Sequence, residues 1–321
     1  MINHSPLFPA PPSALPSVQP GLLILGGSGY LGRALLAHFM SPTGPAAGGW
    51  QVWQSQHNHP ALPHFLDLAK PDLAPFEPIL SQVQFALICG AKPSLRECFE
   101  APENTAQINQ AGPLALAESL SARGIVPVLF SSDYVFGGDH APYDEGAVLA
   151  PRNPYGQQKS ALESALTQHW AESDYLLLRL TKLYDLQLST GSLLGEMATA
   201  WQAGRSIRAA ADQIFNPLLL SDALQAIAEL LRRNARGVYN LGGPEGLNRF
   251  ELAQGLAQCL GVDTGLIQKI GLKDLSEPFL RPCDTRLAID KLQRFLPDWR
   301  PVDLSAACQK FADLHRAGFQ Q

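Results

Sequence analysis

Tyr155 and Lys159 are four positions apart, so on an α-helix their side chains lie on one face, about one turn from each other. An ammonium group held near a phenol favours the phenolate and lowers the pKa of the tyrosine toward the working pH. The pair is suited to give a proton to a ketone during reduction, or to take one from an alcohol during oxidation. Because chance often supplies this spacing, the surrounding elements decide whether it is a site.

Ser132 belongs to a polar stretch, residues 131–134, that directly follows an apolar run at 126–130. We expect the run to be a strand of a parallel sheet, with the serine at its carboxyl end, where ligands bind in open α/β sheets. A hydroxyl there can hold the reacting carbonyl oxygen beside Tyr155. The helix that carries Tyr155 and Lys159 follows this strand, which gives the pair the setting of an active site.

A glycine-rich loop, residues 26–32, connects an apolar run at 22–25 with a helical pattern at 31–39. Gly26, Gly29 and Gly32 allow a tight turn, a close approach of the backbone to a pyrophosphate, and close packing of the helix on the strand. The N-terminus of the helix supplies amide donors for phosphates. Because it lies between a strand and a helix, the loop predicts a dinucleotide-binding site rather than a structural turn.

The predicted cofactor is NADP, with NAD as the alternative. An NAD site usually has an acidic residue about 20 residues after the loop, but the chain has no Asp or Glu between Arg33 and Leu66. Without that carboxylate a 2′-phosphate is not repelled, and Arg33, Ser55 or His57 could contact it. Asp67 follows a further short run expected to be a strand, where its carboxylate either faces the adenine or caps a loop.

The alternation of short apolar runs with amphipathic segments is typical of a parallel sheet with crossover helices. The expected strands are 22–25, 50–53, 85–88, 126–130 and 175–178, and the expected helices are 31–39, 102–123, 155–171, 221–233 and 249–260. We therefore predict an α/β fold, a Rossmann-type doubly wound parallel sheet with a smaller C-terminal substrate lobe. The predicted division is a disordered Pro-rich leader at 1–20, a dinucleotide-binding domain at 21–180 plus about 213–242, and a substrate-binding lobe at 181–212 and 243–321.

Composition limits the classes of partner. The chain of 321 residues has a net charge of −5 and no basic patch that would suit a nucleic acid. Its 5 cysteines include no Cys-x-x-Cys pair, so we expect no disulfide framework and no zinc site, and a reducing cytoplasm fits best. The histidines at 57, 59 and 64 lie in a stretch with prolines at 60 and 63, which is typical of solvated loop histidines, so no metal is predicted. No apolar stretch is long enough to span a membrane, and the expected partner is a small molecule.

In their order and rough spacing, these features resemble the extended short-chain dehydrogenase/reductases. Within that family the chain is most similar to the dTDP-4-dehydrorhamnose reductase group of nucleotide-sugar reductases. The matching stretches are 131–136 (SSDYVF), 153–159 (NPYGQQK), 212–217, 237–243 and 281–287. The resemblance implies that Ser132 polarises the carbonyl group, that Tyr155 donates the proton, and that Lys159 tunes Tyr155 and holds the nicotinamide ribose.

The loop, the missing acid and the resemblance together give a set of binding residues. The expected cofactor contacts are Gly26, Gly29, Tyr30, Leu31, Gly32, Arg33, Ser55, His57, Asp67, Leu68, Gly90, Ala91, Lys92, Asn109, Tyr155, Lys159 and Thr181. The expected substrate contacts are Ser132, Asp133, Tyr134, Gln213, Asn216 and Arg281.

Several of these assignments have plainer alternatives. Arg281 offers a planar fork for a phosphate, but a surface arginine is the alternative. Gln213 and Asn216 either contact a sugar or diphosphate or serve a turn. Asn109 either holds backbone near the site or lies on a helix surface. The resemblance also places Lys182, after Thr181, at the nicotinamide end.

The chain departs from the family pattern in the substrate region. Cys89-Gly90-Ala91 stands where the family usually has Asn-Ala-Ala, and Arg96 and Gly137 stand where an Asp is common. The predicted function is therefore an NADP(H)-dependent reductase of a nucleotide-linked 4-keto-deoxysugar, with the substrate left open.

Three other functions remain alternatives. One is a non-catalytic NADP-binding regulatory subunit, since the SSDYVF stretch is also similar to the beta subunit of methionine adenosyltransferase. The others are a sugar-nucleotide epimerase or dehydratase and a reductase of a non-sugar ketone. Family members commonly pair through helices, which leaves a homodimer open.

Overall fold

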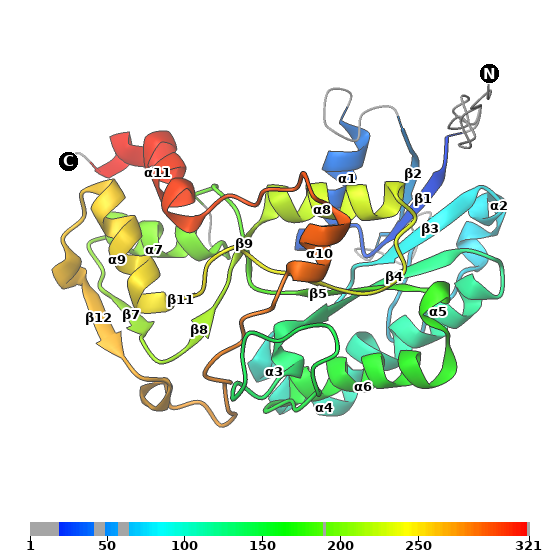
Figure 1. The fold of residues 1–321 in the computed structure, drawn as a ribbon, viewed down its shortest axis with the longest axis horizontal. Helices are drawn as coiled ribbons and strands as arrows, with labels where there is room; N and C mark the ends of the chain where they lie inside the picture. Colours follow the sequence, from blue (N-terminus) through cyan, green and yellow to red (C-terminus); the bar gives the residue numbers. More distant parts are fainter. Residues whose placement is uncertain (1–18, 42–48, 57–63, 189–190, 320–321) are drawn as a thin grey trace, which may run out of the picture.

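The central element of the computed structural model, which describes residues 19–41, 49–56, 64–188 and 191–319, is a parallel sheet. It is six-stranded, in the order β10-β5-β4-β3-β1-β2. The strands are β1 (Gly21–Leu25), β2 (Gln51–Gln54), β3 (Val83–Ile88), β4 (Val126–Ser132), β5 (Leu176–Leu180) and β10 (Gly237–Leu241). The chain moves outward from β1 to β2 and then crosses back to β3, so the strand order reverses between β1 and β3 (Figure 1). The predicted α/β fold with a doubly wound parallel sheet is confirmed.

Helices cover both faces of the sheet (Figure 1). On one face lie α1 (Tyr30–Met40), α8 (Leu220–Arg232) and α10 (Asp290–Phe295), and on the other α2 (Glu77–Leu80), α5 (Gly112–Ser121) and α6 (Pro154–His169). Successive residues of a strand point to opposite faces. Leu22 and Ile24 of β1 accordingly pack in one core cluster, and Leu23 and Leu25 pack in the other. Because both faces are covered, every residue of β1 is buried.

The strand expected before Asp67 is reduced to a single bridge. Gln56, just beyond β2, pairs in parallel with Phe65, and no further residue of this segment joins a strand within the described residues. Asp67 ends the extended chain, because its Oδ1 accepts a hydrogen bond from Ala69 N at 2.9 Å in a local turn. The expectation of a full strand here is therefore wrong.

The helix expected at 102–123 is interrupted. The chain forms α3 (Leu95–Glu100), α4 (Pro102–Ala106), a π-helical segment (Gln107–Ala111) and then α5. A Cβ on Gly112 would lie 1.8 Å from the carbonyl oxygen of Leu68, so the chain packs here in a way that only glycine permits. Such π-helical turns occur frequently at functional sites.

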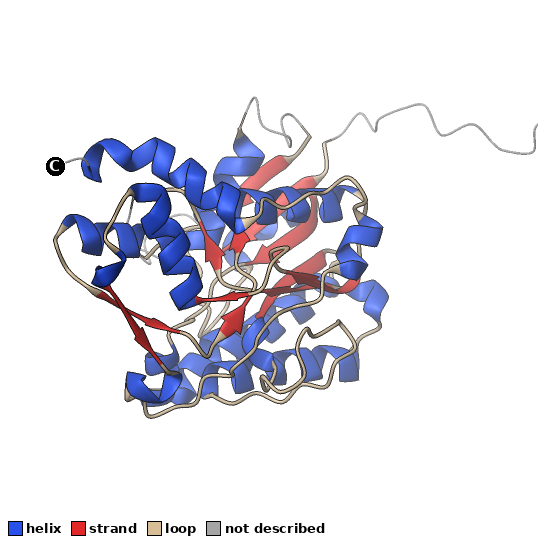
Figure 2. Ribbon diagram, turned by 60° about the vertical axis from the view of Figure 1, so that its left-hand side comes forward, coloured by secondary structure: helices blue, strands red, loops and turns tan. Residues whose placement is uncertain are grey.

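A second core lies in a smaller lobe, on the left in Figure 1 and toward the viewer in Figure 2. It packs α7 (Leu193–Gln202), α9 (Arg249–Leu260) and α11 (Leu304–His315) with the parallel pair β7 (Ile207–Ala210) and β12 (Ile267–Ile270). Two further short pairs are β6 (Leu183–Tyr184) with β9 (Leu218–Leu219), and β8 (Ile214–Phe215) with β11 (Leu247–Asn248). α10, which the sequence assigns to the lobe, packs instead on the sheet through Leu292. The predicted domain bounds remain a prediction.

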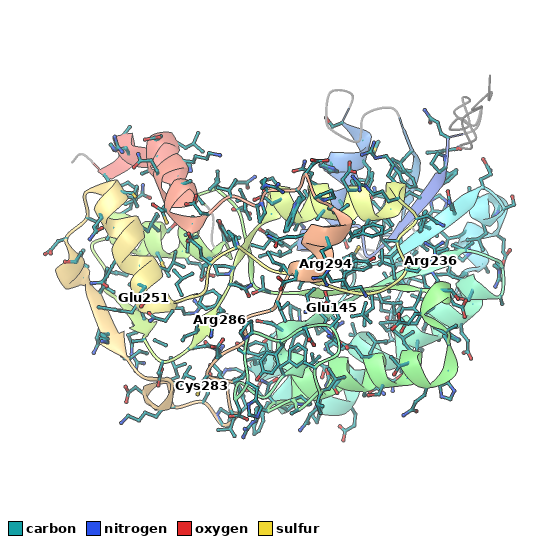
Figure 3. All side chains as sticks on the ribbon, viewed as in Figure 1. Glu145, Arg236, Glu251, Cys283, Arg286 and Arg294 are labelled. Atoms are coloured by element: carbon teal, nitrogen blue, oxygen red, sulfur yellow. The ribbon has the colours of Figure 1, made fainter. Side chains whose placement is uncertain are left out.

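Buried polar contacts fix α6 against the sheet. Arg179 of β5 forms an ion pair with Glu163 of α6 at 2.7 Å, and the two side chains are 5% and 2% exposed. Arg179 Nη1 also donates to the carbonyl oxygen of Glu145, whose side chain accepts from Asn240 N at 3.0 Å. Figure 3 labels Glu145, in the loop between β4 and α6. Among the described residues, no helix has both the length and the apolarity needed to cross a membrane.

Candidate active site

A pocket of about 790 Å³ lies at the carboxyl ends of the central strands, bordered by the smaller lobe. The strand order reverses there between β1 and β3, which is where doubly wound sheets bind ligands. Predicted cofactor residues that line it are Gly26, Gly29, Tyr30, Leu31, Asp67, Leu68, Gly90, Ala91, Lys92, Tyr155, Lys159 and Thr181. Predicted substrate residues that line it are Ser132, Asp133, Tyr134, Gln213 and Arg281. Gly32, Arg33, Ser55, Asn109 and Asn216 lie outside this lining.

The glycine loop is shaped as a phosphate-binding turn. Gly26 has φ +89°, and a Cβ on it would lie 2.5 Å from the amide nitrogen of Gly90. A Cβ on Gly32 would lie 2.3 Å from the carbonyl oxygen of Gly26, so α1 begins in close contact with the loop. Gly29 is the N-cap of α1, and no side chain caps this end. The open amide groups there suit an anionic group such as a pyrophosphate.

Ser55 has a role other than the one expected, whereas the contact of Arg33 with a 2′-phosphate remains a prediction. The Ser55 hydroxyl is 1% exposed and accepts a hydrogen bond from Gly26 N at 2.7 Å. It therefore supports the glycine loop from beneath, and its burial removes it from contact with a 2′-phosphate. Arg33 is exposed, and its Nη1 donates to the Ser28 carbonyl oxygen at 2.7 Å, which keeps the guanidinium next to the loop. His57 lies outside the described residues.

Asp67 forms the loop cap that the sequence allowed, and its facing the adenine remains a prediction. It lines the pocket, and its carboxylate also caps the local turn through Ala69 N.

Asn109 holds the loop that follows β3. Its Oδ1 accepts from Lys92 N at 2.8 Å, and its Nδ2 donates to Lys92 O at 2.9 Å and to Gln158 Oε1 at 2.7 Å. Gln158 lies on α6, next to Lys159. Asn109 is 0% exposed, so the alternative of a helix-surface residue does not hold. Its place in the π-helical segment joins the cofactor side of the pocket to the helix that carries Tyr155.

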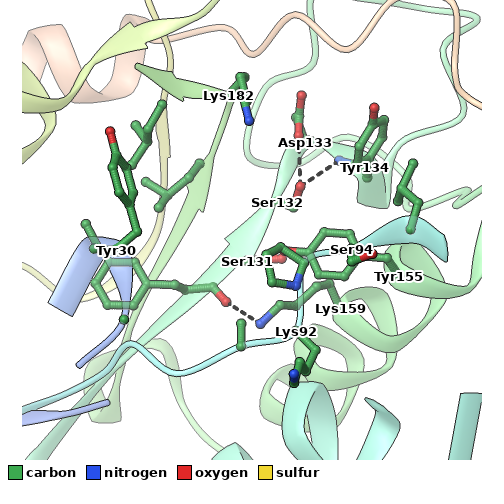
Figure 4. Close-up of a pocket in the computed structure, with 18 of the residues that line it drawn as sticks. Tyr30, Lys92, Ser94, Ser131, Ser132, Asp133, Tyr134, Tyr155, Lys159 and Lys182 are labelled. Atoms are coloured by element: carbon green, nitrogen blue, oxygen red, sulfur yellow. Dashed lines mark hydrogen bonds between the residues drawn. The ribbon is translucent and has the colours of Figure 1, made fainter. Parts of the chain in front are cut away.

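Tyr155 and Lys159 project from the first turns of α6. Asn153 caps this helix by accepting a hydrogen bond from Gly156 N at 2.9 Å. Both side chains are buried, with Tyr155 8% and Lys159 3% exposed. The Lys159 ammonium donates to the carbonyl oxygen of Phe130 at 2.9 Å, which fixes it at the end of β4 (Figure 4).

Burial dominates the ionisation of this pair. It raises the pKa of the Tyr155 phenol, the nearby Asp133 carboxylate raises that pKa further, and a hydrogen bond with Ser132 opposes the rise. Burial also lowers the pKa of Lys159 to about 8, although the Glu163 carboxylate opposes this change. The lowering of the Tyr155 pKa expected from Lys159 is therefore outweighed by desolvation. Tyr155 keeps its proton at neutral pH, as a proton donor must.

Ser132 lies beside Tyr155 at the end of β4. Its hydroxyl donates to Asp133 Oδ1 at 2.8 Å and accepts from Tyr134 N at 3.2 Å (Figure 4). Asp133 is 7% exposed, and burial raises the pKa of its carboxyl to about 6. The strand end thus brings a hydroxyl, a carboxylate and the phenol of Tyr155 together in one part of the pocket.

Two hydroxyl oxygens in the wall have no hydrogen-bond partner in the part of the chain that the structure describes. They are Ser131 Oγ and Thr181 Oγ1, at the carboxyl ends of β4 and β5. Buried polar atoms are normally hydrogen-bonded, so these two suit a polar ligand. Together with the open end of α1, they fit a nicotinamide dinucleotide that extends from the glycine loop toward Tyr155.

On the substrate side, Arg281 is already paired. Its Nε and Nη2 donate to the two carboxylate oxygens of Glu277 at 2.5 and 2.8 Å, and its Nη1 donates to Tyr134 Oη at 3.3 Å. Gln213 Nε2 also donates to Tyr134 Oη at 3.3 Å. Three segments distant in sequence therefore meet around one phenol.

Asn216 has a structural role instead of the predicted contact with substrate. Its side chain bonds the backbone of Gly243 and of Leu287, at 2.9 to 3.0 Å. These bonds occupy its amide and join distant segments, so its role is structural but is not the local turn contact that was the alternative.

Sequence reasoning missed three residues of the substrate side. Leu95 and Phe279 pack on Tyr155 in one apolar cluster, and Arg249 lines the wall from the lobe. A signal for Arg249 exists in the sequence: Asn248 and Glu251 form a capping box, and a cation directly after such a cap opposes the helix dipole.

Comparison with known proteins gives a consistent set of similarities. The sequence model of the family described as RmlD substrate binding domain matches residues 21–312. The dTDP-4-keto-6-deoxy-D-glucose reductase of Streptomyces niveus is 30% identical over 208 residues, 64% of this chain and 69% of that protein. The methionine adenosyltransferase 2 subunit beta of Xenopus tropicalis is 25% identical over 283 residues, 85% of this chain and 81% of that protein.

Among solved structures, the dTDP-4-dehydrorhamnose reductase of Bacillus anthracis strain Ames, in complex with NADP, is similar with a TM-score of 0.77. The match covers 92% of this chain and 99% of that chain at 20% identity, which establishes likeness of fold.

Proposed function

The chain belongs to the RmlD substrate-binding domain family, and from this membership and the pocket we propose that it is an NADP(H)-dependent reductase. Its substrate is the 4-keto group of a nucleotide-linked deoxysugar. The observation that carries the proposal is one pocket lined by the glycine loop, by Ser132 and by Tyr155 with Lys159. Two relatives, the Streptomyces niveus reductase and the dTDP-4-dehydrorhamnose reductase of Sinorhizobium fredii, are named for such keto sugars, which supports the substrate class.

The preference for NADP over NAD rests on the charges near the second strand. No carboxylate occurs in the sequence between Arg33 and Leu66, where an acid would select against a 2′-phosphate. The Arg33 guanidinium lies exposed beside the glycine loop and is available to such a phosphate. The NADP complex of the Bacillus anthracis reductase is in line with this choice.

Binding and proton transfer can be assigned to residues of the chain. The amide groups at the start of α1 hold the pyrophosphate, and Lys159, Ser131 and Thr181 hold the nicotinamide end. Bound NADPH supplies the hydride that reaches the keto carbon. When the substrate binds, the Ser132 hydroxyl turns its hydrogen from Asp133 to the carbonyl oxygen, which takes the proton of the Tyr155 phenol, so the ketone becomes an alcohol. The Lys159 ammonium then stabilises the tyrosinate until it regains a proton from water.

The test is turnover with labelled cofactor. Purified protein is mixed with a dTDP-4-keto-6-deoxysugar and with NADPH or NADH carrying deuterium at the transferable position, and the product is analysed by NMR. We expect a dTDP-6-deoxysugar with deuterium on C4, formed faster with NADPH. Return of unreduced sugar with tightly retained NAD⁺ would instead indicate an epimerase or dehydratase. Turnover of other ketones but of no keto-sugar would move the substrate outside nucleotide sugars.

A second candidate, a regulatory subunit that binds NADP without turnover, is favoured by one observation. The similarity to the methionine adenosyltransferase beta subunit spans 85% of this chain, while that to a probable 4-ketoreductase of Streptomyces antibioticus spans 91%. Ser132, Tyr155 and Lys159 are all present, which argues for catalysis. Copurification with a larger catalytic partner, together with no NADPH oxidation across a panel of keto-sugars, would support the regulatory role.

A further inference from the structure

Two positive side chains in the pocket wall, Lys182 and Arg249, form no ion pair with the acidic residues that the structure describes. Lys182 follows β5, and Arg249 is the first residue of α9 in the smaller lobe. Across the described ranges, neither the ammonium of Lys182 nor the guanidinium of Arg249 makes a hydrogen bond or lies within ion-pair distance of a carboxylate. The contact of Arg249 is with the ring of Phe215, whose centroid lies 5.8 Å from the guanidinium carbon.

The two cations are close enough to act on each other. Burial lowers the pKa of Lys182, and the charges of Arg249 and Arg281 lower it further, while Glu196 and Asp133 oppose this. Burial likewise lowers the pKa of Arg249, Arg281 adds to this effect, and Tyr134, Glu196 and Glu277 oppose it. Like charges held together in a partly buried wall are unfavourable until an anion binds between them.

The position of Arg249 gives no advantage to its own helix. Asn248 and Glu251 form a complete capping box at this end of α9, with hydrogen bonds of 2.9 and 3.0 Å. A positive charge in the first turn opposes the helix dipole, whereas an acidic residue would be favoured. The cation is therefore better explained by a ligand than by the stability of the helix.

The position of Lys182 and Arg249 in the pocket indicates which ligand they bind. In the view of Figure 4, Lys182 points into the pocket between Tyr30 and Asp133, and the Asp133 carboxylate acts on its charge. The charges of Tyr134 and Arg281, on the substrate side, act on Arg249. Arg281, nearby, is neutralised by Glu277, so on the substrate side of the described pocket wall Lys182 and Arg249 remain without an ion-pair partner. A keto-sugar at Tyr155 would be followed, toward the lobe, by the group that joins it to its nucleoside.

We infer that Lys182 and Arg249 together bind the diphosphate of the nucleotide sugar, one cation to each phosphate. A diphosphate diester carries one negative charge on each phosphorus, and the two cations come from separate segments that could each meet one of them. The lysine acts as a point charge, and the arginine can donate two parallel hydrogen bonds. This inference rests on the proposed function, and it moves Lys182 from the nicotinamide end to the substrate.

The experiment measures binding without turnover. Calorimetric titrations with dTDP, thymidine and inorganic pyrophosphate are made in saturating NADP⁺, on wild type, Lys182→Gln and Arg249→Gln. Lys269→Gln serves as the matched control, because it removes a positive charge from an exposed position of the same lobe. We expect each pocket variant to bind dTDP and pyrophosphate about tenfold or more weakly, with thymidine unchanged and the control equal to wild type.

Three results would overturn the inference. The first is equal binding of dTDP and thymidine by wild type, and the second is unchanged dTDP binding in both variants. The third is a matching loss of NADP⁺ affinity, which would assign the cations to the cofactor; unchanged NADP⁺ affinity also shows that a variant is folded. If dTDP binds as expected but no keto-sugar is reduced, the proposed function fails while this subsite stands. If reduction continues in both variants with unchanged KM, the subsite fails alone.

Discussion

The hydroxyl of Ser132 donates its hydrogen bond to Asp133, at 2.8 Å, in the strand end that also contacts Tyr155. This hydrogen bond holds the buried Asp133 carboxylate next to Ser132, and burial raises the pKa of the Asp133 carboxyl to about 6. A raised pKa means that the folded protein keeps the proton of Asp133 at pH values where the unfolded chain has lost it. The ionised carboxylate is thus a destabilising feature of the site at neutral pH.

Asp133→Asn should therefore stabilise the protein near pH 7. Stability of the wild type falls as pH rises from about 4 to about 6, since the unfolded chain binds fewer protons than the folded one across that window. The variant lacks this loss, so its free energy of unfolding at pH 7 should exceed that of wild type by up to about 3 kcal/mol. Urea unfolding from pH 4 to pH 7 measures the difference. A gain that is constant across this range would show that ionisation of Asp133 is not the cause.

The lowered pKa of Lys159 predicts that the rate of reduction falls at alkaline pH. Its pKa is lowered to about 8 by burial, so the ammonium charge beside Tyr155 is lost as pH rises through that value. Without the charge the tyrosinate formed by proton transfer is less stable, and kcat should fall above pH 8. Lys159→Met should be about 100-fold slower, and its kcat should not show the fall above pH 8. A kcat profile from pH 6 to 10 on both proteins checks this, and a wild-type rate that stays flat up to pH 10 contradicts it.

The buried ion pair of Arg179 and Glu163 should matter for stability. Arg179→Met leaves the Glu163 carboxylate buried without its partner, which should cost about 3–5 kcal/mol in the free energy of unfolding. Arg123→Met is the control, because its ion pair with Glu77 is exposed and should contribute less than about 1 kcal/mol. Equal losses in the two variants would argue against a special role for the buried pair.

Asn109 should affect cofactor binding without touching the cofactor. Asn109→Ala removes the bonds to both backbone groups of Lys92, so the loop after β3 loses its attachment to α6. We expect the KM for NADPH to rise about tenfold, kcat to change less, and the free energy of unfolding to fall by about 1–3 kcal/mol. Gln107→Ala, at an exposed position of the same π-helical segment, should change neither. Steady-state kinetics with NADPH as the varied substrate provide the measurement, and an unchanged KM in Asn109→Ala contradicts the assignment.

Much of the fold could be predicted from the sequence because its signals are local. Apolar runs and glycine spacing lie within a few residues of each other, and five of the six strands of the sheet and the loop before α1 are predicted to within a few positions, whereas β10 is not among the expected strands. Tyr155 and Lys159 could be predicted for the same reason, since they share one helix face. Their ionisation could not be, because it depends on burial by residues remote in sequence.

The other differences also arise from contacts between distant segments. The Ser55 hydroxyl accepts a hydrogen bond from Gly26, and the Asn216 side chain accepts one from Leu287. The spacing of these residues in the sequence does not reveal either contact. The periodicity of residues 102–123 predicts a regular helix. The π-helical turn occurs where Asn109 bonds the backbone of Lys92 and Gly112 packs against the carbonyl oxygen of Leu68. Arg249 could have been noticed by its conflict with the helix dipole, although its neighbours in the pocket could not.

The measurement that bears most directly on the central claim is the rate of NADPH-dependent reduction by Tyr155→Phe. The variant lacks only the phenolic oxygen that donates the proton, so kcat should fall by about 10²–10⁴-fold while NADP⁺ and dTDP bind as in wild type. Tyr239→Phe, outside the pocket, should keep the wild-type rate. Turnover by Tyr155→Phe at the wild-type rate would contradict the assignment of Tyr155 as the proton donor.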